Sequence, residues 1–400
     1  MESVIPRIAR DHDLAIIAIT DRPTDLDGLP VDRVLVAYPR DAAAVLDAVA
    51  QTGIEGVDAV MSLGYENPPV ISRLARLWSC PGVPVEVADR CTYKDLRIAA
   101  LEQAGVRTPR FRVFRELAEA AEAAGALGFP AVVKPTDGTS SVGVSVVRDA
   151  NRLPEAVAAA REATGRDALV IEQFVEGTEH TVEGIVADGV VQVAALSDRK
   201  YDAKHRFAPF VFEAGDDLPS AAGPKERAAL EAAAAAAVSA LGIDDSVFST
   251  DLLLTPDGVY VLEVAARLSG SRFGTHLVPL ASGVDIVDAA VRLALGETVD
   301  PTSLVATKST FVASRYFPSA TGVVTYVGDL AAQTWETGVV EVFWEQELEV
   351  GQVLDGYRSA KDMLASAIAW GTTRAEAAGR ADRALAGLPL EIGLIGVDDV

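Results

Sequence analysis

The segment Phe129–Val147, FPAVVKPTDGTSSVGVSVV, constrains the fold of this chain more than any other segment. It predicts a buried strand at Ala131–Val133 that delivers Lys134, a break at Pro135, a Gly/Ser/Thr loop at Gly138–Gly143 and a second strand at Val144–Val147. Small loop residues let backbone N–H groups and hydroxyls approach phosphate oxygens, and the lysine adds a fixed positive charge. The loop is not a Walker-type phosphate loop, because no Gly-Lys-Ser/Thr ends it and a strand follows instead of a helix. The alternative is an ordinary glycine-rich turn.

The composition indicates a soluble α/β protein of two or three domains. The chain has 400 residues, half of them hydrophobic, which is ample for large cores. Its formal net charge of −23 argues against nucleic acid and anionic membrane as partners. The two cysteines, Cys80 and Cys91, show neither metal-ligand spacing nor a disulfide framework, and the N-terminus lacks an apolar signal core. We therefore expect a cytoplasmic protein.

The first 88 residues alternate strand and helix patterns, which is typical of a parallel sheet covered by helices. The expected strands are Leu14–Thr20, Val34–Ala37 and Ala59–Leu63, and the expected helices are Ala42–Thr52 and Val70–Trp78. The chain begins in a helix at about Ser3–Asp11, where a domain of this kind would normally open with a strand and a glycine-rich turn.

The rest of the chain predicts a small α/β unit and then long antiparallel strands. A helix at Lys94–Ala104 leads into the small unit, which ends at about residue 177. Antiparallel strands follow from Thr181, with helices expected at Pro224–Leu241, Ile286–Leu295 and, in the tail, near Thr373–Ala386. The fold class is therefore α/β, with α+β character in parts.

A second informative segment is the hairpin within Phe248–Gly270. Pro256-Asp257-Gly258 predicts a three-residue loop, and in that register Asp251 lies opposite Glu263 on one sheet face. Two facing carboxylates repel each other unless a positive charge lies between them. Magnesium, which prefers oxygen ligands and substrate phosphates, is the natural candidate. The alternative is that one of the carboxylates pairs with Arg267.

Other candidates carry less information. Glu172 ends a strand and is followed by Phe174 and Val175, whose backbone N–H and C=O groups could bind an adenine edge. Glu179, seven residues after Glu172, could accept hydrogen bonds from ribose hydroxyls. The alternative is a solvated acidic turn. Arg267 can hold a phosphate or a carboxylate through its planar fork. The cations Arg199, Lys200, Lys204, His205 and Arg206 predict either a solvated loop or a mobile loop that grips phosphate or substrate.

In their order and spacing these segments resemble the ATP-grasp superfamily, within its carboxylate–amine (amino-acid) ligase branch. The resemblance covers roughly residues 55–320 and rests on Lys94, VVKPTDGTSSVGVS, EQFVEGTEH, the Asp251–Glu263 hairpin and EVAARLSG. It implies an N-terminal Rossmann-like domain at 1–92, a lid subdomain with its connecting helix at 93–177, a catalytic subdomain with an antiparallel sheet at 178–320, and a C-terminal extension at 321–400 packed on the catalytic domain.

The resemblance also implies the roles of individual residues. Lys94 and Lys134 would contact ATP phosphates while the lid loop, with Ser140, Ser141 and Gly143, closes over them. Glu172 and the backbone of Phe174 and Val175 would bind adenine, and Glu179 would bind ribose. Asp251 and Glu263 would bind Mg²⁺, with Mn²⁺ as a substitute, and Arg267 and Lys200 would be catalytic. Ala265 stands where many members carry asparagine, which weakens the case for a second magnesium.

The implied function is an ATP-dependent ligase that activates a small carboxylate, such as an amino acid, as an acyl-phosphate and joins it to an amine. The alternatives are a biotin-carboxylase-like or purine-pathway enzyme and a non-catalytic nucleotide-binding regulator. Retention of all the charged candidate residues argues against the regulator, because unused charged groups cost stability in a fold. The sequence leaves the identity of both substrates and the oligomeric state open, with a homodimer as one alternative.

Overall fold

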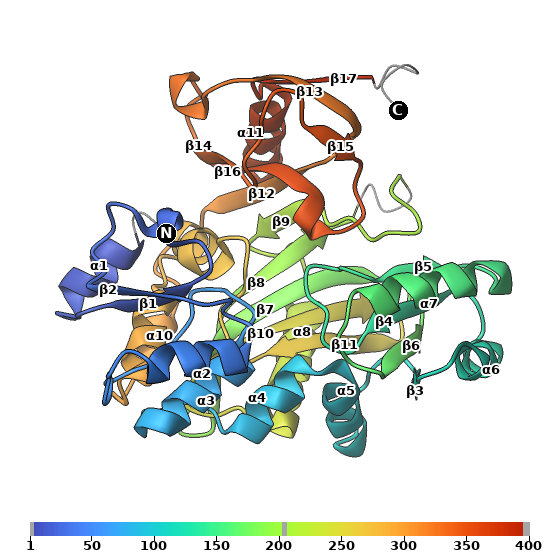
Figure 1. The fold of residues 1–400 in the computed structure, drawn as a ribbon, viewed down its shortest axis with the longest axis horizontal. Coiled ribbons are helices and arrows are strands. Elements are labelled where there is room, and N and C mark those ends of the chain that lie inside the picture. Colours follow the sequence, from blue (N-terminus) through green and yellow to red (C-terminus); the bar gives the residue numbers. More distant parts are fainter. Residues whose placement is uncertain (1–3, 202–205, 395–400) are drawn as a thin grey trace.

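The N-terminal part of the chain, blue in Figure 1, forms a small parallel sheet with helices packed on it. The computed structural model describes residues 4–201 and 206–394. The elements here are α1 (Val4–Asp11), β1 (Ile17–Thr20), β2 (Arg33–Val36), α2 (Ala42–Ala50), α3 (Pro68–Trp78) and α4 (Val85–Thr92). Leu35 of β2 packs against Val45 of α2 and Leu74 of α3, so the alternating pattern correctly predicted a parallel, helix-covered sheet.

The strand expected at Ala59–Leu63 is wrong. No strand is assigned in this segment of the described structure. Its apolar side chains are nevertheless partly buried, because Val60 packs against the α2–α3 core and Met61 and Leu63 pack against the core around α10 (Ile286–Ala294). The alternation of apolar residues therefore reflects contact with two cores and not pairing with a neighbouring strand.

The next segment, which was predicted to be a lid and keeps that name below, forms a four-stranded antiparallel sheet covered by two helices (teal to green in Figure 1). Helix α5 (Lys94–Gln103) leads into it, and the strand order is β3-β6-β4-β5. The elements are β3 (Phe111–Phe114), α6 (Leu117–Leu127), β4 (Ala131–Pro135), β5 (Ser145–Val147), α7 (Leu153–Glu162) and β6 (Leu169–Gln173). Val133 and Ile171 are fully buried against the two helices, which leaves the β4–β5 loop as the free end of the hairpin.

The central sheet has eight strands in the order β11-β10-β7-β8-β9-β12-β16-β14. They are β7 (Thr178–Ala187), β8 (Val190–Lys200), β9 (Gly215–Leu218), β10 (Ser246–Thr255), β11 (Gly258–Ala265), β12 (Phe311–Pro318), β14 (Val339–Trp344) and β16 (Met363–Gly371). Successive side chains of a strand point to opposite faces. Val182 and Val186 accordingly pack against α8 (Pro224–Leu241), while Ile185 packs against α10. A π-helical turn (Phe273–Leu277) and α9 (Val278–Ser282) precede α10.

The β10–β11 hairpin confirms the facing pair Asp251 and Glu263, but by a different register from the expected one. Thr255 pairs with Gly258, so the loop has two residues and not three. A bulge between Asp251 and Leu252 then places one extra residue in β11 and restores the expected pairing. The two departures cancel at the position of the carboxylates.

The C-terminal part of the chain, orange and red in Figure 1, both extends the central sheet and adds a small one. The small sheet contains β13 (Thr321–Val327), β15 (Val353–Asp355) and β17 (Leu390–Gly393). Helix α11 (Arg374–Ala386) packs against alanines of β12 and β16, close to where a final helix was expected. Among the described helices, none combines the length and the apolarity needed to cross a membrane.

Candidate active site

Two buried lysines lie at the base of the lid loop. Lys94 opens α5, and its Nζ donates to the carbonyl oxygen of Gly138 at 2.5 Å. Lys134 ends β4, and its Nζ lies 2.5 Å from Oε1 of Glu172 on the neighbouring strand β6. The pKa of Lys94 is lowered to about 8, because burial and the charges of Arg97 and Lys134 together outweigh the opposing charge of Glu263. The site therefore holds two cations close enough to repel each other, which favours an anionic ligand.

The lid loop has the strained backbone that close approach to a ligand requires. Ser140 and Ser141 have φ values of 54° and 56°, and Gly143 has 72°. A Cβ atom at Gly143 would lie 2.5 Å from the Cβ of Ala163, so only glycine fits there. Residues that bear a Cβ are uncommon in this left-handed region, and strain of this kind concentrates at ligand-binding loops.

The lid loop is also held from outside its own sheet. Arg40, from the N-terminal part, donates to the hydroxyl of Thr139 at 3.2 Å and to the carbonyl oxygen of Asp137 at 2.9 Å. The backbone N–H of Ala360, in the C-terminal part, donates to the carbonyl oxygen of Ser140 at 2.9 Å. Parts of the chain far apart in sequence thus meet at the loop that the sequence predicted to be a lid.

The facing carboxylates are each accompanied by an arginine. Arg199 of β8 makes ion pairs with Asp251 and with Glu213, and the hydroxyl of Thr181 donates to Asp251 at 2.9 Å. Burial would raise the pKa of Glu263, but the charges of Arg97, Lys94 and Arg267 lower it to about 2. Glu263 is therefore ionised at neutral pH, Asp251 is held by Arg199, and the oxygens of both carboxylates can accept a metal ion.

Arg97 was missed by the sequence reasoning. It lies one helical turn after Lys94, is 1% exposed, and its Nη1 is 4.0 Å from Oε1 of Glu263. Nη1 also donates to the carbonyl oxygen of Cys91 at 2.9 Å, while Nε and Nη2 have no hydrogen-bond partner among the residues described. The signal that could have revealed it is the i, i+3 spacing of Lys94 and Arg97, which places both cations on one helix face.

Arg199 is the member of the predicted cation cluster that forms ion pairs with Asp251 and with Glu213. Neighbouring residues of a strand point to opposite faces, so Arg199 and Lys200 cannot both face Asp251. The catalytic role of Lys200 stays a prediction. Lys204 and His205, from the same predicted cluster, lie outside the described residues.

Arg267 is bound by a residue from another part of the fold. Its Nε and Nη2 pair with Glu66, which precedes α3, and its Nη1 donates to the carbonyl oxygen of Leu268 at 2.8 Å. The expected alternative, a pair with one of the hairpin carboxylates, is therefore not the main contact. Burial opposes ionisation, but Glu66, Glu263 and Asp251 together raise the pKa of Arg267. Arg267 lies at the meeting point of the N-terminal part and the carboxylate site.

The residues predicted to bind adenine and ribose lie along β6 and β7. Glu172 is engaged with Lys134, as described above. The N–H of Phe174 donates to the carbonyl oxygen of Pro130 at 3.2 Å, so this group is already used within the lid. The pKa of Glu179 is raised to about 7, because burial and the nearby charge of Asp251 together outweigh the charge of Arg199. The roles of Glu172, Phe174, Val175 and Glu179 stay predictions.

The carboxylates of Asp251 and Glu263 fit a magnesium ion that is also bound by a substrate better than a metal ion bound by protein side chains alone. In the described ranges, no group of three or more His, Cys, Asp or Glu side chains could hold a metal. Two facing carboxylates are nevertheless what Mg²⁺ usually takes from a protein, because waters and substrate phosphates supply its remaining ligands. Asp251 and Glu263 are thus suitable only together with a phosphate-bearing ligand.

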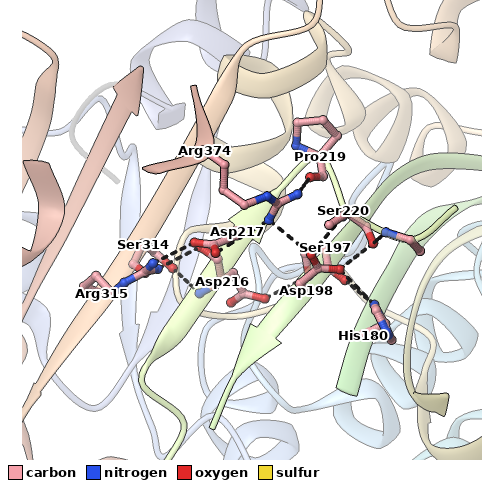
Figure 2. Close-up of polar contacts among 12 residues, drawn as sticks. His180, Ser197, Asp198, Asp216, Asp217, Pro219, Ser220, Ser314, Arg315 and Arg374 are labelled. Atoms are coloured by element: carbon pink, nitrogen blue, oxygen red, sulfur yellow. Dashed lines mark hydrogen bonds and ion pairs between the residues drawn. The ribbon is translucent and has the colours of Figure 1, made fainter. Parts of the chain in front are cut away.

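A second polar network fixes β8 and β9 to the C-terminal part of the chain (Figure 2). Nη1 of Arg374, at the start of α11, lies 3.1 Å from Asp198 and 3.6 Å from Asp217, and Arg315 of β12 lies 2.8 Å from Asp217. Buried His180 lies 3.1 Å from the other oxygen of Asp198. Asp198 is the residue directly before Arg199, so this network positions the strand that carries Arg199 to the carboxylate site.

Sequence comparisons link these features to known proteins. Residues 93–302 match the family described as carbamoyl-phosphate synthase L chain, ATP binding domain. Over 205 residues the chain is 34% identical to a D-alanine–D-alanine ligase of Gloeobacter violaceus, an alignment that covers 47% of this chain and 63% of that protein. Over 185 residues it is 31% identical to carnosine synthase 1 of Gallus gallus, covering 43% of this chain and 19% of that protein. The chain thus spans less than two thirds of either relative.

A solved structure matches over almost the whole chain. The crystal structure of an L-amino acid ligase from Bacillus licheniformis is similar with a TM-score of 0.81 and 26% sequence identity. The similarity covers 98% of this chain and 95% of that one. The N-terminal and C-terminal parts, which lie outside the family match, therefore have counterparts in a single known structure.

Proposed function

Because this chain belongs to the ATP-grasp superfamily, through the family of carbamoyl-phosphate synthase L chain ATP-binding domains, we propose that it is an ATP-dependent carboxylate–amine ligase. The observation that carries the proposal is the group of cations around the hairpin carboxylate Glu263: Arg97 lies 4.0 Å from it, and the charges of Lys94, Arg267 and Lys134 act on it as well. Cations from the lid, from α5 and from the end of β11 thus surround one pair of acids. The similarity to D-alanine–D-alanine ligase, carnosine synthase and L-amino acid ligase supports amide formation between small substrates.

Phosphoryl transfer needs positioned positive charge more than it needs a protein nucleophile. Lys94 and Lys134 would bind the phosphates of ATP, and Glu172 keeps the ammonium of Lys134 in place. A substrate carboxylate attacks the γ-phosphorus, the bond to the bridging oxygen breaks, and ADP leaves. The substrate amine then attacks the carbonyl carbon of the acyl-phosphate, and phosphate leaves with the carbon–oxygen bonding pair.

Arg267 would hold the acyl-phosphate as its negative charge develops, because it lies just beyond the strand that carries Glu263. Asp251 and Glu263 would hold Mg²⁺, which when bound neutralises phosphate charge. Glu179 and the backbone around Phe174 and Val175 would bind the nucleoside. Arg97 would add a third buried cation next to the phosphates, since two of its donors lack a partner within the described chain.

The test is a screen of amino-acid pairs for ADP release, followed by isotope transfer. A substrate labelled with oxygen-18 in its carboxylate should deliver one labelled oxygen to the released phosphate, because the carboxylate oxygen stays on phosphorus when the acyl-phosphate is cleaved. Unlabelled phosphate from a reaction that consumes ATP and forms product would rule out the acyl-phosphate route. ATP consumption that depends on bicarbonate and on no amino acid would instead support the carboxylase alternative.

A further inference from the structure

A cavity of about 360 Å³ lies between the N-terminal part of the chain and the lid loop. This volume falls in the range of pockets that bind small molecules. Its lining includes Arg40 and Glu66 from the N-terminal part, Thr139 from the lid loop, and Lys361 from the turn Ala360–Asp362. Thr139 belongs to the lid loop and Glu66 pairs with Arg267, whereas Arg40 and Lys361 have no proposed contact with ATP or with the hairpin carboxylates.

Two cations of this cavity lie at its lid side. Arg40 is fixed there by its hydrogen bonds to Thr139 and to the backbone of Asp137. Lys361 directly follows Ala360, whose backbone N–H donates to the carbonyl oxygen of Ser140 in the lid loop. The Cα of Lys361 is therefore held close to the same loop. The other lining arginine, Arg73, is already paired with Asp89 at 3.1 Å. A ligand carboxylate would therefore be attracted to Arg40 and Lys361.

Acceptor groups also line the cavity. Asn67 is 8% exposed and its Nδ2 donates to the carbonyl oxygen of Pro39 at 3.3 Å, but its Oδ1 receives no hydrogen bond from residues 4–201 or 206–394. The hydroxyl of Thr92, which also lines the cavity, is likewise without a partner in those ranges. Glu66 adds a carboxylate next to them. Buried acceptors without a donor are costly, and a ligand that donates would remove this cost.

We propose that this cavity binds the substrate that supplies the amine, and that this substrate is a zwitterionic amino acid. Its carboxylate is held by Arg40 and Lys361, and its ammonium group by Glu66 and Asn67. The proposal rests on the ligase function proposed above. The ion pair between Glu66 and Arg267 separates this cavity from a second one, lined by Arg267 and both hairpin carboxylates. An amine bound at Glu66 therefore lies beside the place where the acyl-phosphate would form.

The test compares Michaelis constants for the two amino acids of an active pair. Mass spectrometry of the product identifies which amino acid supplied the amine. Lys361→Ala should raise the KM of that amino acid about tenfold, as expected for the loss of one charge-assisted hydrogen bond, and leave the KM values of ATP and of the acyl-supplying amino acid within about twofold. Arg358→Ala is the matched control, because Arg358 lies in the same segment, is 61% exposed and does not line the cavity.

A substrate variant gives an independent reading. The C-terminal amide of the amine-supplying amino acid lacks the carboxylate, so wild-type protein should use it with a raised KM, and Lys361→Ala should not raise this KM further. Equal KM values for the acid and its amide, or equal effects of Lys361→Ala and Arg358→Ala, would overturn the proposal.

Direct binding separates this proposal from the ligase function. If no amino-acid pair releases ADP, the ligase function fails, and saturation-transfer NMR with each of the twenty amino acids tests the cavity alone. Binding that Lys361→Ala weakens and Arg358→Ala preserves would support the cavity. Absence of binding by all twenty, or binding that neither variant changes, would overturn it.

Discussion

Arg267 and Glu66, 201 residues apart in sequence, form a buried ion pair that joins the end of β11 to the loop before α3. The side chains are 17% and 11% exposed, so the pair is largely shielded from water. Breaking a buried pair leaves an uncompensated charge and costs more than an exposed pair would. The N-terminal part of the chain therefore takes part in the site through Glu66 and is not merely attached to the nucleotide-binding region.

Replacing Arg267 by lysine should reduce turnover more than nucleotide affinity. The change keeps the charge but removes the planar fork that holds Glu66 and that, in the proposed mechanism, would also hold the developing acyl-phosphate. We expect kcat to fall about 100-fold, as for the loss of one preorganised group that stabilises transition-state charge, with the Kd of ATP within about threefold. Steady-state kinetics and calorimetry check this. An equal loss in both quantities would place Arg267 at the nucleotide instead.

Replacing Lys134 by alanine should weaken ATP binding about 10- to 100-fold, measured by calorimetry. The variant removes a charge-assisted contact to phosphate and leaves Glu172 as an uncompensated anion near the nucleotide. Lys225→Ala, at the exposed start of α8, removes the same charge elsewhere and should leave the affinity unchanged. Equal affinities of the two variants would contradict the assignment of Lys134.

Replacing Glu263 by glutamine should destabilise the protein at neutral pH and destabilise it less in acid. The folded protein lowers the pKa of Glu263 from 4.5 to about 2, so its stabilisation is present above pH 4.5 and is lost as the pH falls towards 2. Such a shift corresponds to about 3 kcal/mol, which solvent screening reduces to roughly 1–2 kcal/mol because the side chain is 36% exposed. Denaturant unfolding at pH 7 and pH 3.5 measures the difference. A higher stability of the variant at pH 7 would mean that carboxylate repulsion outweighs the surrounding cations.

Replacing Arg374 by methionine should test the network of Figure 2. Burial raises the pKa of Asp198, but hydrogen bonds from His180 and Ser220 and the charge of Arg374 lower it to about 2. The variant removes a positive charge that pairs with Asp198 and Asp217, so the two carboxylates repel each other more strongly. We therefore expect the free energy of unfolding to fall by about 3 kcal/mol. The exposed Arg358→Met is the control. If both variants lost the same free energy of unfolding, the other partners of Asp198 and Asp217 would be sufficient to stabilise these two carboxylates.

The sequence predicted those parts of the site whose geometry is local. Asp251 and Glu263 belong to one hairpin, where strand pairing decides which residues face each other, and a bulge compensated for the shorter loop. Lys94 and Lys134 were recognised because a helix start and a strand end place them at a glycine-rich loop. Short-range backbone geometry was sufficient for these residues.

The partners of these residues could not be predicted in the same way. Glu66 and Arg199 reach their partners in the site only through the packing of elements distant in sequence, and one sequence alone does not show which of many charged residues do so. The strand expected at residues 59–63 failed for a related reason, since contact with two cores produced an apolar pattern like that of a strand.

The pH dependence of ATP binding should depend on Lys94. Burial and neighbouring cations lower its pKa to about 8, so the ammonium group loses its proton as the pH rises through 8. Because phosphate favours the protonated form, the Kd of ATP should increase between pH 7.5 and 9.5, by up to about tenfold for each pH unit above the pKa of Lys94 in the free protein. Lys94→Arg carries a group that stays charged in this range and should show a flatter profile. Calorimetry of both proteins across this range, in buffers of matched ionic strength, checks the expectation. Parallel profiles for the two proteins would show that a group other than Lys94 controls the titration.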